Sequence, residues 1–144
     1  MDPATLDIDD LTVGQEYSIQ VDVTEEDVDR FAALSGDRSP LHMDAGFARS
    51  RGFENRVVHG AFLVALVSRL VGVHLPGANG LLQTVHMKFA APIYVGDSIR
   101  VIGVVDQISV AVRVAVVKIT VARTVTSEIV ASGKATVGFT QSRT

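Results

Sequence analysis

The chain has 144 residues, a hydrophobic fraction of 47% and a formal net charge of −3 at pH 7. This length fits one domain with a full core, the hydrophobic fraction excludes a disordered chain, and the acidic balance argues against a nucleic-acid partner. The absence of cysteine excludes disulfides, thiolate metal sites and a cysteine nucleophile. We therefore expect a single domain over residues 1–144.

The first ten residues, M-D-P-A-T-L-D-I-D-D, are acidic and contain no apolar core segment. A secretory signal needs a positively charged start followed by an apolar stretch, so this segment does not have the pattern of a signal peptide. We expect a cytoplasmic protein with no membrane partner.

The first predicted strand covers Tyr17–Val23, where apolar and polar residues alternate. A short helix is predicted from Thr24 to about Ser35, because the threonine can cap free amides and three acidic residues follow it. Gly36 is suited to end this helix. Because Pro40 cannot continue it, we expect residues 36–41 to form an ordered turn.

This predicted turn places Asp37 and His42 close together. An imidazole titrates near neutral pH, and a neighbouring carboxylate can orient it or share the proton transfer, so the pair can hold and activate one water molecule. The plainer interpretation is that Asp37 caps the turn and His42 is a core histidine.

The segment Gly60–Val73, G-A-F-L-V-A-L-V-S-R-L-V-G-V, is apolar on nearly every face of a helix, so we expect it to be buried all round. It is shorter than the roughly 20 residues of a bilayer span, and a sheet is its simplest cover. Four later segments rich in Val, Ile and Thr are predicted strands that pair antiparallel. They are residues 82–89, 98–108, 110–125 and 129–139. The predicted fold class is α+β, an antiparallel β-sheet wrapped around a long central helix.

Three motifs together resemble one known family. They are S-G-D-R-S-P-L-H-M-D-A-G-F-A from Ser35, V-V-H-G-A-F from Val57 and F-A-A-P-I-Y-V-G-D-S from Phe89. The chain thereby resembles the MaoC-like (R)-specific enoyl-CoA hydratases and dehydratases. This resemblance implies a single hot dog domain with its core at about residues 13–139. It also implies a hydro-lyase of fatty acid metabolism that interconverts trans-2-enoyl-CoA and (R)-3-hydroxyacyl-CoA.

The resemblance also implies roles for individual residues. Asp37 and His42 match the family's water-holding dyad, Gly60 matches the residue whose amide receives the thioester oxygen, and Ser68 matches a serine used near the site. Taken alone, Ser68 could equally be a hydroxyl bonded back to its own helix. One departure is Ser39, which stands where most members have Asn and can make only a shorter, weaker turn hydrogen bond.

The role of Gly60 also follows from its position at the start of the apolar helix. Hydration of an enoyl thioester moves negative charge onto the thioester oxygen, and a helix N-terminus offers unpaired N–H groups and a partial positive charge. A glycine there could also serve packing alone. His59, the preceding residue, is expected to shape this donor and to belong to the substrate-binding site. His74, near the other helix end, is expected to be structural, because an imidazolium suits the negative end of the dipole.

Arg51 and Arg56 belong to a basic cluster between the turn and the apolar helix. Both are candidates for binding the phosphates of coenzyme A or of a phosphopantetheine carrier, and the alternative is a solvated charged surface. We expect no cofactor beyond the coenzyme A or phosphopantetheine that forms part of the substrate.

We expect no metal site. Asp37, His42 and Asp44 could ligate zinc or iron, but no third histidine falls at ligand spacing, and the family needs no metal.

The predicted function is therefore reversible hydration of enoyl thioesters. Two alternatives remain: a hot dog acyl thioesterase, which would hydrolyse the thioester, and a non-catalytic acyl-thioester-binding or partner subunit in which the dyad is only structural. A homodimer is expected, because the helix needs cover and a long apolar strand such as residues 110–125 makes a poor free edge.

Overall fold

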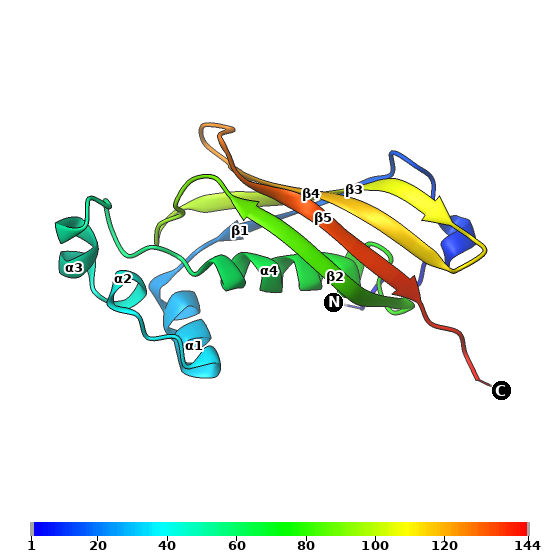
Figure 1. Cartoon of the computed structure of the whole chain (residues 1–144), viewed down its shortest axis with the longest axis horizontal. Helices are drawn as coiled ribbons and strands as arrows, with labels where there is room; N and C mark the ends of the chain where they lie inside the picture. The colour runs from blue at the N-terminus through cyan, green and yellow to red at the C-terminus, as the bar shows by residue number, and fades with distance from the viewer. Residues whose placement is uncertain (1, 144) are drawn as a thin grey trace.

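The computed structural model describes residues 2–143, in which a five-stranded antiparallel sheet curves over one long helix (Figure 1). The strands are β1 (Glu16–Asp22), β2 (Gly80–Phe89), β3 (Ser98–Ser109), β4 (Val114–Arg123) and β5 (Ile129–Phe139). The helical elements are η1 (Ile8–Asp10), α1 (Glu25–Ser35), α2 (Pro40–Met43), α3 (Ala45–Ser50), α4 (Gly60–Arg69) and η2 (Leu70–His74). The predicted antiparallel sheet around a central helix is confirmed.

The strands follow the spatial order β1-β3-β4-β5-β2, and every neighbouring pair is antiparallel. The register places Ile19 opposite Val101 and Val117 opposite Ala135, so apolar residues of adjacent strands share one face. β1 and β2 form the two edges of the sheet. Register shifts in the β2–β5, β3–β4 and β4–β5 pairs accompany the curvature that wraps the sheet over α4.

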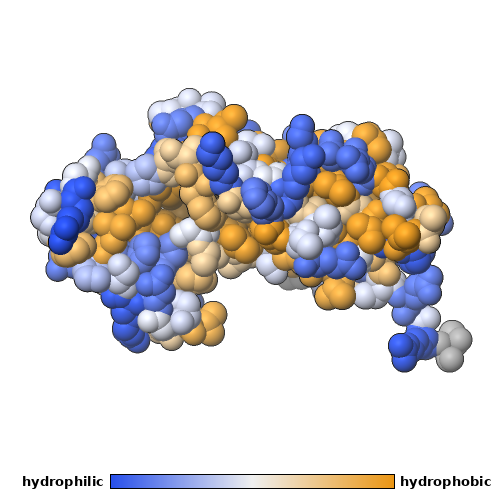
Figure 2. Space-filling view, in the orientation of Figure 1, coloured by the Kyte–Doolittle hydropathy of each residue, from blue (hydrophilic) through white to orange (hydrophobic). Residues whose placement is uncertain are grey.

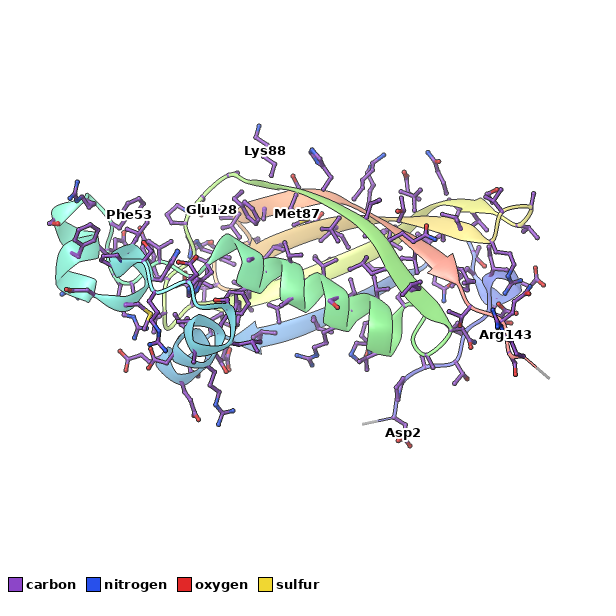
Figure 3. All side chains as sticks on the ribbon, turned by 60° about the horizontal axis from the view of Figure 1, so that its bottom comes forward. Asp2, Phe53, Met87, Lys88, Glu128 and Arg143 are labelled. Atoms are coloured by element: carbon purple, nitrogen blue, oxygen red, sulfur yellow. The ribbon has the colours of Figure 1, made fainter. Side chains whose placement is uncertain are left out.

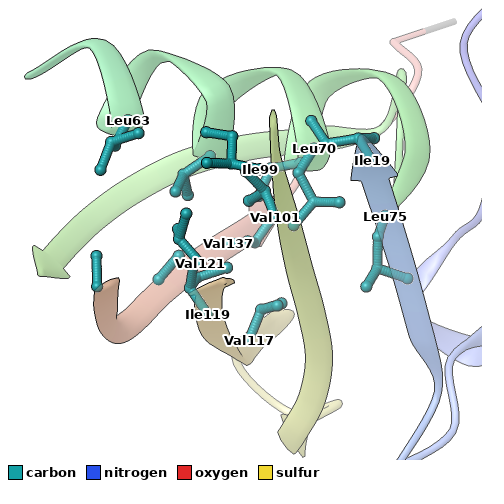
Figure 4. Packing of buried hydrophobic residues seen from close by; sticks show 14 of the residues in the cluster. Ile19, Leu63, Leu70, Leu75, Ile99, Val101, Val117, Ile119, Val121 and Val137 are labelled. Carbon is teal, nitrogen blue, oxygen red and sulfur yellow. The ribbon is translucent and has the colours of Figure 1, made fainter. Parts of the chain in front are cut away.

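The core lies between α4 and the concave face of the sheet (Figure 4). Leu63 and Val67 of α4 and Leu70 of η2 are buried at helical spacing, and they face alternate residues of the strands, among them Val101 and Ile119. A side chain of this size stabilises the fold by about 1.5–3 kcal/mol when fully buried. The sheet therefore fixes the position and direction of α4.

The prediction that the central helix is buried all round is wrong for the described residues. Ala61, Ala65, Ser68 and Arg69 are exposed on the face of α4 that points away from the sheet. A single curved sheet covers only one side of a helix, and the sequence pattern could not distinguish the side it leaves open. Figure 2 shows hydrophobic residues exposed across the middle of the molecule, in the region where Figure 1 places β2 and α4.

The predicted helix after β1 is confirmed as α1. Thr24 Oγ1 accepts a hydrogen bond from the N–H of Asp27 at 3.1 Å, and the Asp27 carboxylate accepts one from the N–H of Thr24 at 3.0 Å. These reciprocal bonds satisfy two donors that would otherwise be free at the helix start. Gly36 ends the helix with a φ of 79°, a conformation that favours glycine.

The boundaries of three other segments differ from the prediction. Pro40 begins the short helix α2 instead of lying within a turn, because a fixed φ and a missing N–H suit the first position of a helix. α3 was not predicted. The segment predicted as one strand over residues 110–125 contains turns at both ends of β4. Within residues 2–143, no helix has both the length and the apolarity to cross a bilayer.

Candidate active site

The predicted Asp37–His42 turn lies beyond the N-terminal end of α4, where α1, α2 and α3 extend past the sheet (Figure 1). The Asp37 N–H donates to Ser35 Oγ at 3.1 Å, and the Asp37 carboxylate accepts from the Ser39 N–H at 3.2 Å. Asp37 itself thus closes the turn, and the backbone of Ser39 supplies the donor. Pro40 then starts α2 and places His42 on its first turn.

His42 and Asp37 face one another across a short gap. His42 Nε2 lies 3.7 Å from Asp37 Oδ2, which is too long for a direct hydrogen bond and suits one water molecule that contacts both atoms. His42 Nδ1 lies 2.7 Å from the carbonyl oxygen of Val57. Because a carbonyl oxygen only accepts, Nδ1 carries the hydrogen of the neutral ring and Nε2 carries the lone pair. The free lone pair is therefore on the side of Asp37.

Gly60 is the first residue of α4, and the side chain of the preceding residue, His59, does not cap the helix. The Phe62 N–H bonds to the His59 carbonyl at 3.1 Å, which leaves the N–H groups of Gly60 and Ala61 without intrahelical acceptors. A Cβ on Gly60 would lie 3.1 Å from the Phe89 ring. The glycine thus allows the ring to pack directly beside the helix start.

His42 and Gly60 line the same cavity, which has a volume of about 310 Å³. The rest of the wall is mainly apolar, as expected for a site that receives an acyl chain. It consists of Phe53, Val57, Val58, Leu63, Phe89, Ala90, Ala91, Pro92 and Ile93. Phe53 lies on the segment after α3, so the cavity draws on both the helical extension and the sheet (Figure 3).

The loop between β2 and β3 forms one wall of the cavity and is held from both sides. The Val58 N–H donates to the Ile93 carbonyl at 2.7 Å. The Arg123 guanidinium donates to the Pro92 carbonyl and pairs with Asp97. These contacts fix the loop against the start of α4 and the adjoining strand β4.

His59 lies behind the dyad and is 1% exposed. Its Nε2 is 2.9 Å from the carbonyl oxygen of Asp37, and its ring stacks on the ring of His42 at a centroid distance of 3.9 Å. His59 does not line the cavity. The sequence suggested that this residue shapes the donor, and its contacts with both dyad residues had no signal in the sequence.

The structure corrects one step of the metal argument, because His59 does bring a third histidine to the dyad. Ligand atoms of Asp37, His42 and His59 all lie within 4.8 Å of one another. However, the N–H at His59 Nε2 is used by the Asp37 carbonyl, and the stacked rings of His42 and His59 hold their lone pairs in two nearly parallel planes. The carboxylate of Asp44, the other candidate ligand, accepts from the Phe47 N–H and caps α3.

Two predicted substrate-binding residues lie outside the cavity. Ser68 is exposed on the open face of α4, about 12 Å along the helix from Gly60 at 1.5 Å per residue. The exposed Arg51 has its guanidinium 4.7 Å from the centroid of the Phe47 ring. Their roles stay predictions.

Arg56 is held within the protein and is 8% exposed. Its Nε donates to the His42 carbonyl at 2.6 Å, and Nη2 donates to the Asp29 carboxylate at 2.6 Å. These bonds connect the dyad helix to α1 and direct two of its N–H groups away from solvent. A phosphate contact by Arg56 stays a prediction, and these contacts favour a structural role.

The apolar wall of the cavity could not be assigned from the sequence. Phe53, Leu63 and the segment from Phe89 to Ile93 come from three separate places in the chain. The only signal was the third motif, F-A-A-P-I-Y-V-G-D-S, whose first five residues all line the cavity.

The family model described as "MaoC like domain" matches residues 10–137. The chain belongs to the MaoC-like domain family. The resemblance inferred from the three motifs is therefore confirmed.

Members with the same architecture are also found among solved structures. An (R)-hydratase from A. caviae involved in PHA biosynthesis is 31% identical, with a TM-score of 0.85 over 89% of this chain and 96% of that one. The unliganded R-hydratase of Pseudomonas aeruginosa is 28% identical, with a TM-score of 0.88 over 96% of this chain and 88% of that one. The fold of this MaoC-like chain is accordingly the hot dog fold.

Among curated proteins, the (R)-specific enoyl-CoA hydratase of Aeromonas caviae is 39% identical over 89 residues, which are 62% of this chain and 66% of that protein. The mitochondrial 3-hydroxyacyl-[acyl-carrier-protein] dehydratase of Arabidopsis thaliana is 41% identical over 86 residues, which are 60% of this chain and 49% of that protein. The matched part thus spans about half to two thirds of these relatives. Both names describe the addition or removal of water at an acyl thioester.

Proposed function

We propose that this MaoC-like chain is a hydro-lyase that reversibly hydrates trans-2-enoyl thioesters to (R)-3-hydroxyacyl thioesters. The supporting observation is that one cavity joins a free imidazole lone pair beside a carboxylate to an unpaired helix amide. The names of the relatives agree with this reaction class. Coenzyme A or phosphopantetheine enters as part of the substrate.

The proposed reaction begins with a water molecule between His42 and Asp37. His42 Nε2 takes one proton as the water oxygen forms a bond to the β-carbon, and Asp37 accepts a hydrogen bond from the other hydrogen. The π electrons of the double bond move to the α-carbon and the thioester oxygen. The Gly60 N–H binds that oxygen while it carries negative charge.

The second step returns the proton to carbon. The proton held on His42 moves to the α-carbon as the enolate collapses, so that one water molecule supplies both the hydroxyl and the new hydrogen. Asp37 stabilises the imidazolium between the two steps through their 3.7 Å separation. Dehydration follows the same path in reverse.

The first experiment measures the loss of enoyl absorbance with crotonyl-CoA. We expect turnover by the wild type and a fall in kcat of about 10²–10⁴-fold in both Asp37→Asn and His42→Ala. Glu54→Gln is a matched control, because this exposed carboxylate belongs to the same extension and does not line the cavity. Chiral analysis of the product should give the (R)-3-hydroxyacyl thioester.

Two results would contradict this proposal. Release of free thiol without a hydroxyacyl product indicates the thioesterase alternative. Binding of enoyl thioesters, whether linked to coenzyme A or to a carrier protein, without turnover indicates a non-catalytic subunit.

We also propose that the chain forms a homodimer. The open face of α4 exposes Ala61 and Ala65, and the edge strand β2 exposes 58% of Leu81 and 48% of Phe89. An unpaired strand edge and an uncovered helix face are both suited to a second copy. Sedimentation at micromolar concentration should give a dimer, and a monomer would contradict the proposal.

We propose that the protein is located in the cytoplasm. One relative is named as mitochondrial, so cell fractionation of a tagged protein is the appropriate test.

A further inference from the structure

His59 contacts both residues of the proposed dyad and directly precedes the proposed amide donor in the chain. It is the residue before the amide donor Gly60, it is 1% exposed, and it lies outside the lining of the cavity. A substrate contact is therefore a poor description of its role.

The first contact holds Asp37. A carbonyl oxygen only accepts, so His59 Nε2–H donates to the Asp37 carbonyl at 2.9 Å. The Asp37 side chain is 52% exposed, and its N–H and Oδ1 bond to Ser35 and Ser39 within the same turn. The bond from His59 ties this turn to the start of α4.

The second contact holds His42. The two imidazole rings stack with a centroid distance of 3.9 Å and an interplanar angle of 26°. The His59 ring also packs against the Phe31 ring at a centroid distance of 4.9 Å. The Phe31 ring contacts the Phe62 ring edge-on at a centroid distance of 5.8 Å. With its Nδ1–H bonded to the Val57 carbonyl, His42 is thus held both at its edge and on its face.

The protonation state of His59 fits these contacts. Its Nδ1 is buried and has no hydrogen-bond partner among the described residues. The neutral ring with hydrogen on Nε2 leaves only a lone pair unpaired at this position. A second hydrogen on Nδ1 would create a buried donor with no acceptor, which is costly.

We propose that His59 is a positioning residue that sets the distance between the water-binding dyad and the oxyanion donor. This inference rests on the proposed function. One side chain holds Asp37 through its carbonyl and His42 through its ring, while the peptide bond that follows it carries the Gly60 N–H. Misplacement of reacting groups by about 1 Å costs about 10²-fold in rate.

The test uses two variants of similar size. His59→Leu fills the space but removes both the donor and the aromatic ring, and we expect kcat to fall about 10- to 100-fold while KM changes less than about threefold. His59→Gln keeps an N–H donor near the position of Nε2 but lacks the ring that stacks on His42, so we expect its kcat to lie between those of His59→Leu and the wild type. Urea unfolding of both variants checks that each is folded.

Specific kinetic results would overturn the inference. Wild-type kcat in folded His59→Leu contradicts it, and so does a His59→Gln variant as impaired as His59→Leu. A rise in KM with unchanged kcat indicates a substrate contact instead.

Nuclear magnetic resonance of ¹⁵N-labelled histidines tests the same inference without turnover. We expect hydrogen on Nε2 of His59 and on Nδ1 of His42 in the wild type, with the His42 signal lost or shifted in both His59→Leu and His59→Gln, because neither side chain can stack on the His42 ring. An unchanged His42 signal in both variants overturns the inference. If the wild type hydrates no enoyl thioester while these signals behave as expected, the proposed function fails and the positioning role stands.

Discussion

The two ends of the central helix each bury a histidine against an aromatic ring, and the two histidines have very different surroundings. His59, before α4, stacks on His42 at 3.9 Å and donates to the Asp37 carbonyl. His74, at the end of η2, stacks on Tyr17 at 4.3 Å, and its Nε2 is buried without a partner among the described residues. Both rings are less than 10% exposed.

Burial of an imidazole therefore does not by itself distinguish the candidate active site from the other end of the helix. At the start of α4, buried contacts hold neighbouring groups that keep a free lone pair and a free amide facing a cavity. At the end of η2, burial lowers the pKa of His74, and the charge of Arg69 lowers it further. In the proposed reaction the first arrangement prepares proton transfer at its neighbours, whereas the second favours the neutral form of one ring.

At the start of α4, the variant Gly60→Ala tests this comparison with the largest expected change, a loss of activity. The new methyl group would meet the Phe89 ring at 3.1 Å, beside the proposed donor. We expect kcat on an enoyl thioester to fall about 10- to 100-fold, somewhat less than the 10²–10³ typical of a lost oxyanion donor. Phe89→Leu in the same chain should recover part of the activity. Unchanged kcat in Gly60→Ala would remove Gly60 from the proposed mechanism.

A smaller effect is expected from Arg56→Ala, because Arg56 bonds to the His42 carbonyl and pairs with Asp29. We expect a loss of about 1–3 kcal/mol in the free energy of unfolding, below the 3–5 kcal/mol of fully buried pairs, because Asp29 is 56% exposed. Urea unfolding measures this loss. A fall in kcat with little change in KM should accompany it, and the reverse pattern would restore the phosphate-binding role.

Arg51→Ala provides the contrast to Arg56→Ala. Arg51 is exposed, and its guanidinium lies over the Phe47 ring. If it meets the phosphates of coenzyme A, we expect KM for the CoA thioester to rise a few-fold while kcat and the free energy of unfolding stay near wild type. The KM should also depend on salt less steeply than in the wild type. Equal KM values for the two proteins would exclude the contact.

The smallest effect concerns the other end of the helix. Because the pKa of His74 is lowered in the folded protein, the unfolded chain binds more protons below the ordinary value of 6.5. The free energy of unfolding should thus decrease as the pH falls from about 7 to 5, and the loss is complete only below the lowered pKa. His74→Phe keeps a ring against Tyr17 and should weaken this dependence. Parallel curves of the two proteins would show that another group causes it.

Local patterns predicted the elements whose signals lie within a few residues. Thr24, the acidic residues that follow it and Gly36 placed both ends of α1 correctly. Alternating residues placed β1, and runs of Val, Ile and Thr placed β3 and β5 within a few residues of their bounds. Each of these features depends on hydrogen bonds or periodicity in the local backbone, which the sequence contains directly.

Contacts between distant segments explain what the sequence missed. Arg56, a candidate for a phosphate contact, bonds to Asp29 and the His42 carbonyl, 27 and 14 residues away, and nothing in the sequence indicated these bonds. His59 was not expected beside Asp37, which precedes it by 22 residues. Packing against α1 and α4 decides which side chain lies behind the Asp37–His42 turn. Local periodicity in the sequence does not contain this information.

The sequence by itself determined which groups are available for the proposed reaction: a carboxylate and an imidazole around Pro40 and a glycine that opens an apolar helix. It also contains the motifs of the MaoC-like family. Only the tertiary structure decided how these groups are combined. It selected the tautomer of His42 through the Val57 carbonyl, brought Phe89 beside Gly60 and left one face of α4 open. The physical reason is that residue type fixes which protons and lone pairs exist, whereas their directions depend on packing between segments that are far apart in the chain.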